Sequence, residues 1–98
     1  MSKHLQASIR FLLTAEGGRL TAPMSGVRPH IKLGEVFTTA IVHSLTKDEV
    51  FELGRDYEVD LEILFWEEYG HLWREDAPIE LFDGNRLIAR GRPVPSRT

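Results

Sequence analysis

The sequence predicts an all-β domain closed into a small barrel or sandwich. Six segments of the 98-residue chain have strand-like composition or alternation of apolar and polar residues. No segment has a helical pattern long enough to cover a sheet. Because an open sheet of six short strands would leave both edges exposed, closure of the sheet on itself is the favoured arrangement.

The first half of the chain contains three of the expected strands. Residues 6–13 alternate with a period of two, which places the apolar side chains on one face. Gly17 and Gly18 follow, and two successive glycines indicate a turn because either can adopt positive φ. After a loop rich in proline and glycine, we expect strands at residues 29–33 and 36–45; the latter is rich in Val, Ile, Thr and Phe.

Residues 47–55 form the one segment compatible with a helix. Thr46 could cap it, with Glu49 three residues later as in a capping box, and Gly54 could end it. The segment is short, so we expect no more than a single helical turn.

The second half of the chain contains the clearest strand pattern. Residues 57–65 alternate between apolar and mostly acidic side chains, which predicts a strand with one buried face. Residues 67–77 are polar and typical of turns. Residues 79–82 and 86–91 are expected to form a hairpin closed by the tight turn at residues 83–85.

Composition indicates one globular domain with an ordered core at about residues 6–93. Apolar residues make up 42% and charged residues 28% of the chain, which is ordinary for globular proteins. The absence of cysteine excludes disulfides, thiolate zinc sites and cysteine nucleophiles. The glycine-rich motifs of nucleotide-binding loops are absent, so we expect no cofactor or bound nucleotide. With no transmembrane stretch and no secretory signal, we expect a cytoplasmic protein without membrane contact.

Charge is unevenly distributed along the chain. Residues 1–34 carry five basic and one acidic side chain, residues 35–85 carry three and fourteen, and residues 86–98 carry four and none. If the two ends meet in space, they form a basic face opposite an acidic one. Such a face could attract a phosphate backbone; the alternative is a solvated surface of neutralising pairs.

Three motifs resemble the C-terminal, third β-barrel domain of elongation factor Tu. The motif Glu16-Gly17-Gly18-Arg19 is followed, at the spacing of that family, by Gly26-Val27-Arg28-Pro29, and residues 78–86 are similar to the family's final hairpin. The resemblance covers about residues 6–93. It implies a six-stranded antiparallel Greek-key barrel, present here as a free-standing single domain without the GTPase domain.

The resemblance also implies candidate RNA contacts. In that family this barrel contacts the T-stem of aminoacyl-tRNA. The matching positions, together with a neighbouring arginine, form a candidate RNA or anion site: Arg19, Arg28, His30, Thr39, Asp83 and Gly84. Two alternatives stay open, namely that the two arginines brace the loop and that the final glycine only forms a turn.

A second candidate surface lies between the fourth and fifth expected strands. Trp66, Tyr69 and Trp73 are spaced through a segment that is otherwise polar. If exposed, they form a candidate protein interface, because aromatic residues are enriched in interface cores. The alternative is packing at the mouth of the barrel.

These observations favour a non-enzymatic binding module. The first hypothesis is a protein-interaction domain whose partner is unknown or is a second copy of the chain. The alternative is a module linked to translation that binds tRNA or another structured RNA. No arrangement typical of a nucleophile is recognisable, and His71 with Glu67 and Glu68 is too sparse a set to predict a metal site.

Overall fold

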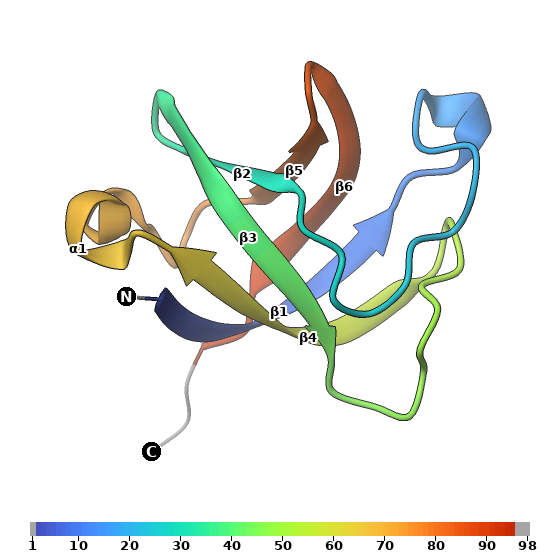
Figure 1. The fold of residues 1–98 in the computed structure, drawn as a ribbon, viewed down its shortest axis with the longest axis horizontal. Coiled ribbons are helices and arrows are strands. Elements are labelled where there is room, and N and C mark those ends of the chain that lie inside the picture. Colours follow the sequence, from blue (N-terminus) through green and yellow to red (C-terminus); the bar gives the residue numbers. More distant parts are fainter. Residues whose placement is uncertain (1, 96–98) are drawn as a thin grey trace.

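The computed structural model describes residues 2–95, which form a closed six-stranded antiparallel β-barrel (Figure 1). This confirms the predicted all-β barrel. Its strands are β1 (Ser2–Phe11), β2 (His30–Leu33), β3 (Val36–Ser44), β4 (Asp56–Leu64), β5 (Ile79–Asp83) and β6 (Arg86–Pro93). The expected strand of residues 6–13 begins earlier, at Ser2, because its whole N-terminal half pairs with β4.

The strands follow a Greek-key path. Around the barrel the order is β1-β4-β3-β2-β5-β6, and β6 pairs with β1 to close it. Strands β2, β3 and β4 are consecutive antiparallel neighbours, while β1 lies on the far side of β4. The connection from β1 to β2, residues 12–29, therefore crosses one end of the barrel. The two terminal strands, β1 and β6, lie side by side, so the condition stated above for a basic face, that the two ends of the chain meet, is fulfilled.

Alternating side chains of the strands form the core. The inward-facing residues of β4, from Tyr57 to Ile63, are almost wholly buried, as the period-two pattern predicts. One end of the barrel is filled by three aromatic rings. Phe51 stacks on Phe11 with ring centroids 5.4 Å apart and meets Tyr57 edge-on at 5.2 Å.

The structure corrects the helical turn expected at residues 47–55, which is an extended loop. The hydroxyl of Thr46 accepts the N–H of Asp48 and donates to its carboxylate at 2.6 Å, so it caps no helix. Val50 forms an isolated β-bridge with Met24. The main-chain N–H of Phe51 donates to the carbonyl of Pro23, which holds the chain extended while the ring enters the core.

Short helical elements occur instead in the segments expected to be turns. They are η1 (Thr14–Glu16), α1 (Trp66–Tyr69) and η2 (Gly70–Leu72). Phe65 ends β4 in the left-handed region, with φ 58°, and turns the chain into α1. No helix among residues 2–95 has the length and apolar character needed to cross a bilayer. Arg97, counted among the C-terminal basic residues, lies outside the described residues.

Candidate functional site

The Glu-Gly-Gly-Arg motif forms a tight turn after β1. The Glu16 carboxylate accepts the N–H of Leu13 at 2.9 Å, and Gly17 lies in the left-handed region with φ 90°. A side chain at Gly18 would collide with the carbonyl of Leu12. These three positions are therefore explained by local structure.

Arg19 is the exception within this motif. Its carbonyl accepts the Thr14 hydroxyl at 2.6 Å, but its guanidinium makes no hydrogen bond or ion pair with residues 2–95. The same holds for the guanidinium of Arg28. Neither arginine side chain braces the loop through a polar contact, so both charges are available to an external anion.

The barrel brings several of the predicted RNA-site residues together. His30 of β2 lies opposite Thr39 of β3 on one side and opposite Phe82 of β5 on the other. Asp83 and Gly84 follow Phe82 directly, and Gly84 forms the β5–β6 turn with φ 62°. Arg28 precedes β2, whereas Arg19 lies on the 12–29 connection with no described contact to the others.

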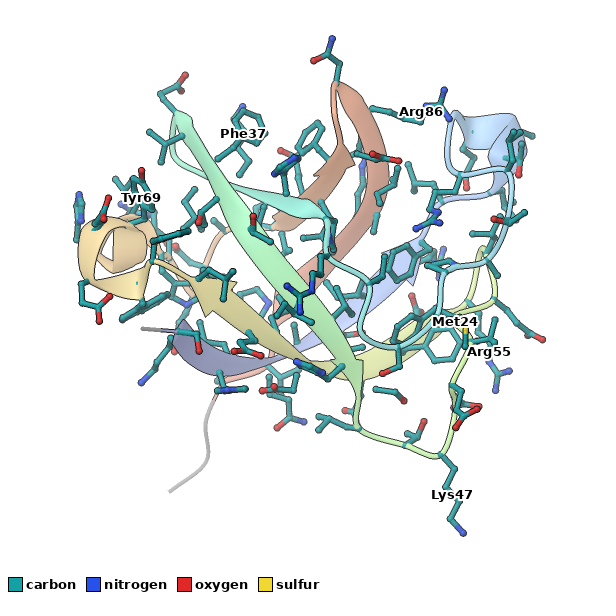
Figure 2. The ribbon with its side chains drawn as sticks, in the orientation of Figure 1. Met24, Phe37, Lys47, Arg55, Tyr69 and Arg86 are labelled. Atoms are coloured by element: carbon teal, nitrogen blue, oxygen red, sulfur yellow. The ribbon has the colours of Figure 1, made fainter. Side chains whose placement is uncertain are left out.

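An aromatic pair lies on the same outer surface and was not predicted. Phe37 of β3 is 50% exposed and meets Phe82 edge-on, with ring centroids 5.3 Å apart and an interplanar angle of 85°. Phe37 lies opposite Lys32 of β2, and Figure 2 shows it on the outside of the β2–β3 hairpin. We call this surface the β2 face; its residues are Arg28, His30, Lys32, Phe37, Thr39 and Phe82.

The β2 face carries cations that have no internal partner. Arg28, Lys32 and the nearby Arg86 form no ion pair within the described chain. By contrast, Arg10 of β1 binds Asp56 of β4 through Nε at 2.9 Å. That hydrogen bond lowers the pKa of Asp56. Positive charge is thus neutralised beside β4 and left free beside β2.

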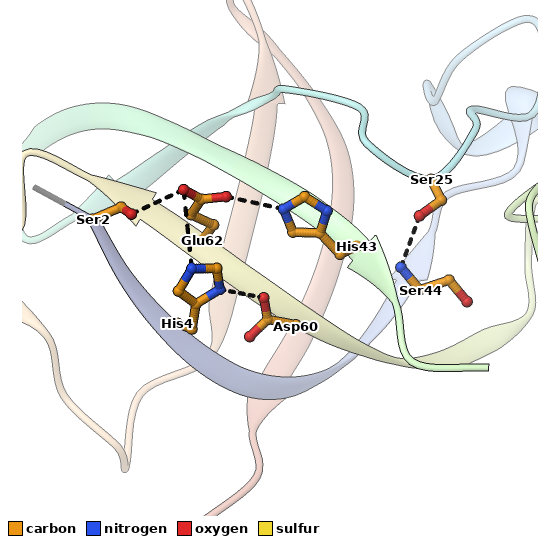
Figure 3. Close-up of polar contacts among 7 residues, drawn as sticks. All are labelled: Ser2, His4, Ser25, His43, Ser44, Asp60 and Glu62. Atoms are coloured by element: carbon orange, nitrogen blue, oxygen red, sulfur yellow. Dashed lines mark hydrogen bonds and ion pairs between the residues drawn. The ribbon is translucent and has the colours of Figure 1, made fainter.

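The outer side of β4 carries a polar cluster whose charged side chains are paired with one another, in contrast to the β2 face (Figure 3). His4 Nδ1 lies 2.6 Å from Asp60 Oδ2, and His43 Nε2 lies 3.0 Å from Glu62 Oε1. Ser2 Oγ donates to Glu62 Oε2 at 2.8 Å. The hydrogen bond to Asp60 raises the pKa of His4, and those from His43 and Ser2 lower the pKa of Glu62. Two histidines therefore bond to carboxylates of the acidic strand, and no group of three or more His, Asp or Glu side chains in residues 2–95 is arranged to hold a metal ion.

The predicted protein-interface aromatics pack against the barrel. Trp66, Tyr69 and Trp73 are partly buried against the core, and the two indole rings lie 6.4 Å apart. Gly70 permits this packing, since a side chain there would collide with the Trp66 ring. Figure 2 shows where Tyr69 lies on α1. These side chains cover the barrel, and only their remaining surface is open to a partner.

Comparisons with known proteins add no support for the family resemblance, which therefore rests on the motifs quoted above. No protein-family model matches the chain, and a search of curated proteins found no match. A six-stranded barrel alone does not identify the elongation factor Tu domain. Function must therefore be argued from the surface itself.

Proposed function

We propose that the chain is a non-enzymatic binding module that recognises another protein through the β2 face. The observation that carries the proposal is the half-exposed ring of Phe37, held edge-on against Phe82 among unpaired cations. Interfaces are enriched in aromatic residues and arginine. The resemblance to the elongation factor Tu barrel supports this proposal, since that domain acts by contact and not by catalysis. We further propose a cytoplasmic location, which the absence of cysteine suits.

RNA is the second candidate ligand for this surface. Its support is the free guanidinium of Arg28 beside the His30–Thr39 pair, at positions that the resemblance links to tRNA. Cationic side chains contribute most of the affinity of non-specific RNA binding through phosphate contacts. Translation-related binding of structured RNA is therefore the alternative.

The charge of the whole chain favours a protein partner. The net charge is −3, and Asp83 and the half-buried Glu80 lie close to the β2 face on β5. A phosphate backbone crossing this surface would pass these carboxylates at every step, whereas a protein segment can place a neutral hydrogen-bond donor there. The aromatic pair also offers apolar area that phosphate contacts would not use.

Retention of a partner from lysate, compared between variants, tests the proposal. Phe37→Ala should abolish specific capture by the immobilised chain, because it removes the exposed ring. Leu20→Ala is the matched control, since Leu20 is 81% exposed on the 12–29 connection, and it should capture as the native chain does. Equal capture by both variants would contradict the proposal.

The same proteins distinguish RNA from protein. If RNA is the ligand, tRNA binding should fall steeply between about 50 and 200 mM salt, linearly in log–log form, and Arg28→Ala should weaken it. RNA would replace protein as the proposed ligand if tRNA binding showed this salt dependence and if Phe37→Ala left the capture of protein unchanged.

A further inference from the structure

The barrel wall opens between β2 and β5. The ladder between these strands ends at the pair of Ile31 with Leu81. Beyond it, β2 continues through Leu33 paired only with β3, and the start of β5 at Ile79 pairs only with β6. The last two residues of β2 and the first two of β5 therefore have no cross-strand partner across this gap. Unpaired strand edges of this kind are able to pair with an added extended segment.

A pocket of about 290 Å³ lies at this opening; we call it the β2–β5 pocket. Ile31, Leu33 and Ile79 contribute buried apolar side chains, and Leu72 of η2 and the following Trp73 add further apolar lining. Ligand pockets usually measure roughly 300–1,000 Å³. The volume lies at the lower end of this range and suits one large anchoring side chain.

Trp73 supplies an unsatisfied donor in the pocket wall. Its indole Nε1 is buried and has no hydrogen-bond partner within the described residues. A buried polar group without a partner costs free energy and calls for an explanation. Because the Trp73 ring lines the pocket, an occupant of the pocket would change the surroundings of this N–H.

The rim of the pocket is more cationic than anionic. Lys32 is exposed and forms no ion pair with described residues. Arg74 reaches Asp76 only at 3.5 Å, with both side chains more than 70% exposed, so this pair is weak and open to exchange. Glu80 is the one acidic side chain in the lining. Lys32 is therefore the unpaired cation of the lining, and it can meet a carboxylate of an occupant beside the anchor.

The pocket continues into the exposed aromatic surface. Lys32 lines the pocket and is also the cross-strand partner of Phe37. A chain lying along β2 would pass from the pocket over Phe37 without leaving the β2 face. This continuity links the pocket to the surface for which a protein partner is proposed.

We propose that the β2–β5 pocket binds an extended segment of a partner protein in which one large apolar side chain is flanked by carboxylates. The anchor fills the pocket, the main chain pairs with the free strand edges, and a carboxylate lies against Lys32. This inference rests on the proposed function, because it takes the partner to be a protein. It adds the chemistry of the partner segment that the pocket recognises.

Peptide titration with NMR detection tests the inference directly. The probe is acetyl-Glu-Asp-Leu-Asp-Glu-amide, and the comparison peptides carry Ala at the centre or Lys and Arg on the flanks. The ¹H–¹⁵N spectrum of the native chain should show saturable shifts of the Trp73 indole N–H and of amides 31–34 and 79–80. Trp66→Phe assigns the two indole signals. The Ala-centred and basic peptides should bind at least about fivefold more weakly.

Charge-reversal variants supply the matched control. Lys32→Glu should weaken binding of the acidic peptide about fivefold. Lys47→Glu, on the exposed loop far from the pocket (Figure 2), should leave binding unchanged. Equal effects of the two variants, or equal binding of the Leu- and Ala-centred peptides, would overturn the inference.

The outcomes separate this inference from the proposed function. If the acidic peptide shifts none of these signals while Phe37→Ala still abolishes capture of the partner, the pocket is not the recognition site and the proposed function stands. If oligouridine shifts the pocket signals and the acidic peptide does not, the occupant is RNA and both proposals fail.

Discussion

Gly91 shows how a single side chain would disturb closure of the barrel. A Cβ at this position of β6 would collide with the carbonyl oxygen of Ser8 and with the Ile9 side chain. The pairing of β6 with β1 therefore depends on a residue without a side chain at this point, in the middle of the ladder that closes the barrel.

We predict that Gly91→Ala lowers the free energy of unfolding by about 1–3 kcal/mol, because overpacking forces the backbone apart. Urea unfolding monitored by tryptophan fluorescence measures the loss. Gly17→Ala is the comparison: no atom lies within 4 Å of its added Cβ, and only the backbone conformation is strained. A Gly91→Ala variant as stable as the native chain would contradict the prediction.

His4 makes stability depend on pH. Its hydrogen bond to Asp60 raises its pKa in the folded state above the unfolded value of about 6.5. The pair thus contributes stability below pH 6.5 and loses that contribution as pH rises through the folded pKa. In urea unfolding, the stability difference between the native chain and His4→Gln should be larger at pH 5.5 than at pH 8.5. An equal stability difference at the two pH values would contradict this prediction.

At the scale of the element, the loop of residues 45–55 shows where local signals mislead. Thr46, Glu49 and Gly54 fit the capping rules of a helix, but Phe51 is fully buried between Phe11 and Tyr57. Burial of this ring outweighs the weak helical preference of so short a segment. Helix propensity cannot predict the burial of Phe51, because the residues that surround its ring are distant in sequence.

The Tyr57 hydroxyl holds this loop to the barrel. It accepts the main-chain N–H of Glu52 at 2.9 Å, so Tyr57→Phe should lower the free energy of unfolding by about 1 kcal/mol. Hydrogen exchange of the Glu52 amide should also accelerate. Tyr69→Phe is the control, since the Tyr69 hydroxyl makes no described hydrogen bond, and unchanged exchange at Glu52 in Tyr57→Phe would disprove the role.

The strands and the site differ in how far sequence predicts them. The alternation in β4 and the β5–β6 turn depend on neighbours in the chain, so their positions follow from pattern alone. The exposure of Phe37 could have been inferred only from the alternation of side chains along β3. Phe37 lies an odd number of residues from the buried Ala40 and Val42, so its side chain is on the opposite face. Its contact with Phe82, and the gap beside β2, depend on strand order and so required the structure.

At the scale of the whole molecule, the first and last strands are neighbours. Ala7 of β1 lies opposite Pro93 of β6, and Figure 1 shows the start of β1 and the end of β6 on the same side of the barrel. Joining them by a short linker should therefore leave every strand pair intact.

We predict that a circular permutant with its ends joined by a glycine-serine linker, and with new termini at Leu20–Thr21, folds to the same barrel. The new ends fall on the exposed 12–29 connection, where chain breaks are tolerated. Circular dichroism should give the spectrum of the native chain. Urea unfolding should give a free energy of unfolding within about 2 kcal/mol of the native value. A permutant opened inside β4 should not fold, and equal stability of both would contradict this account of closure.

The position of β1 between β4 and β6 also sets an order of events during synthesis. The ribosome makes β1 first, yet one of its two neighbours is the last strand to be made. Until β6 has emerged, one edge of β1 has no strand to pair with, and the nascent chain offers this unpaired edge to chaperones or to other copies of itself.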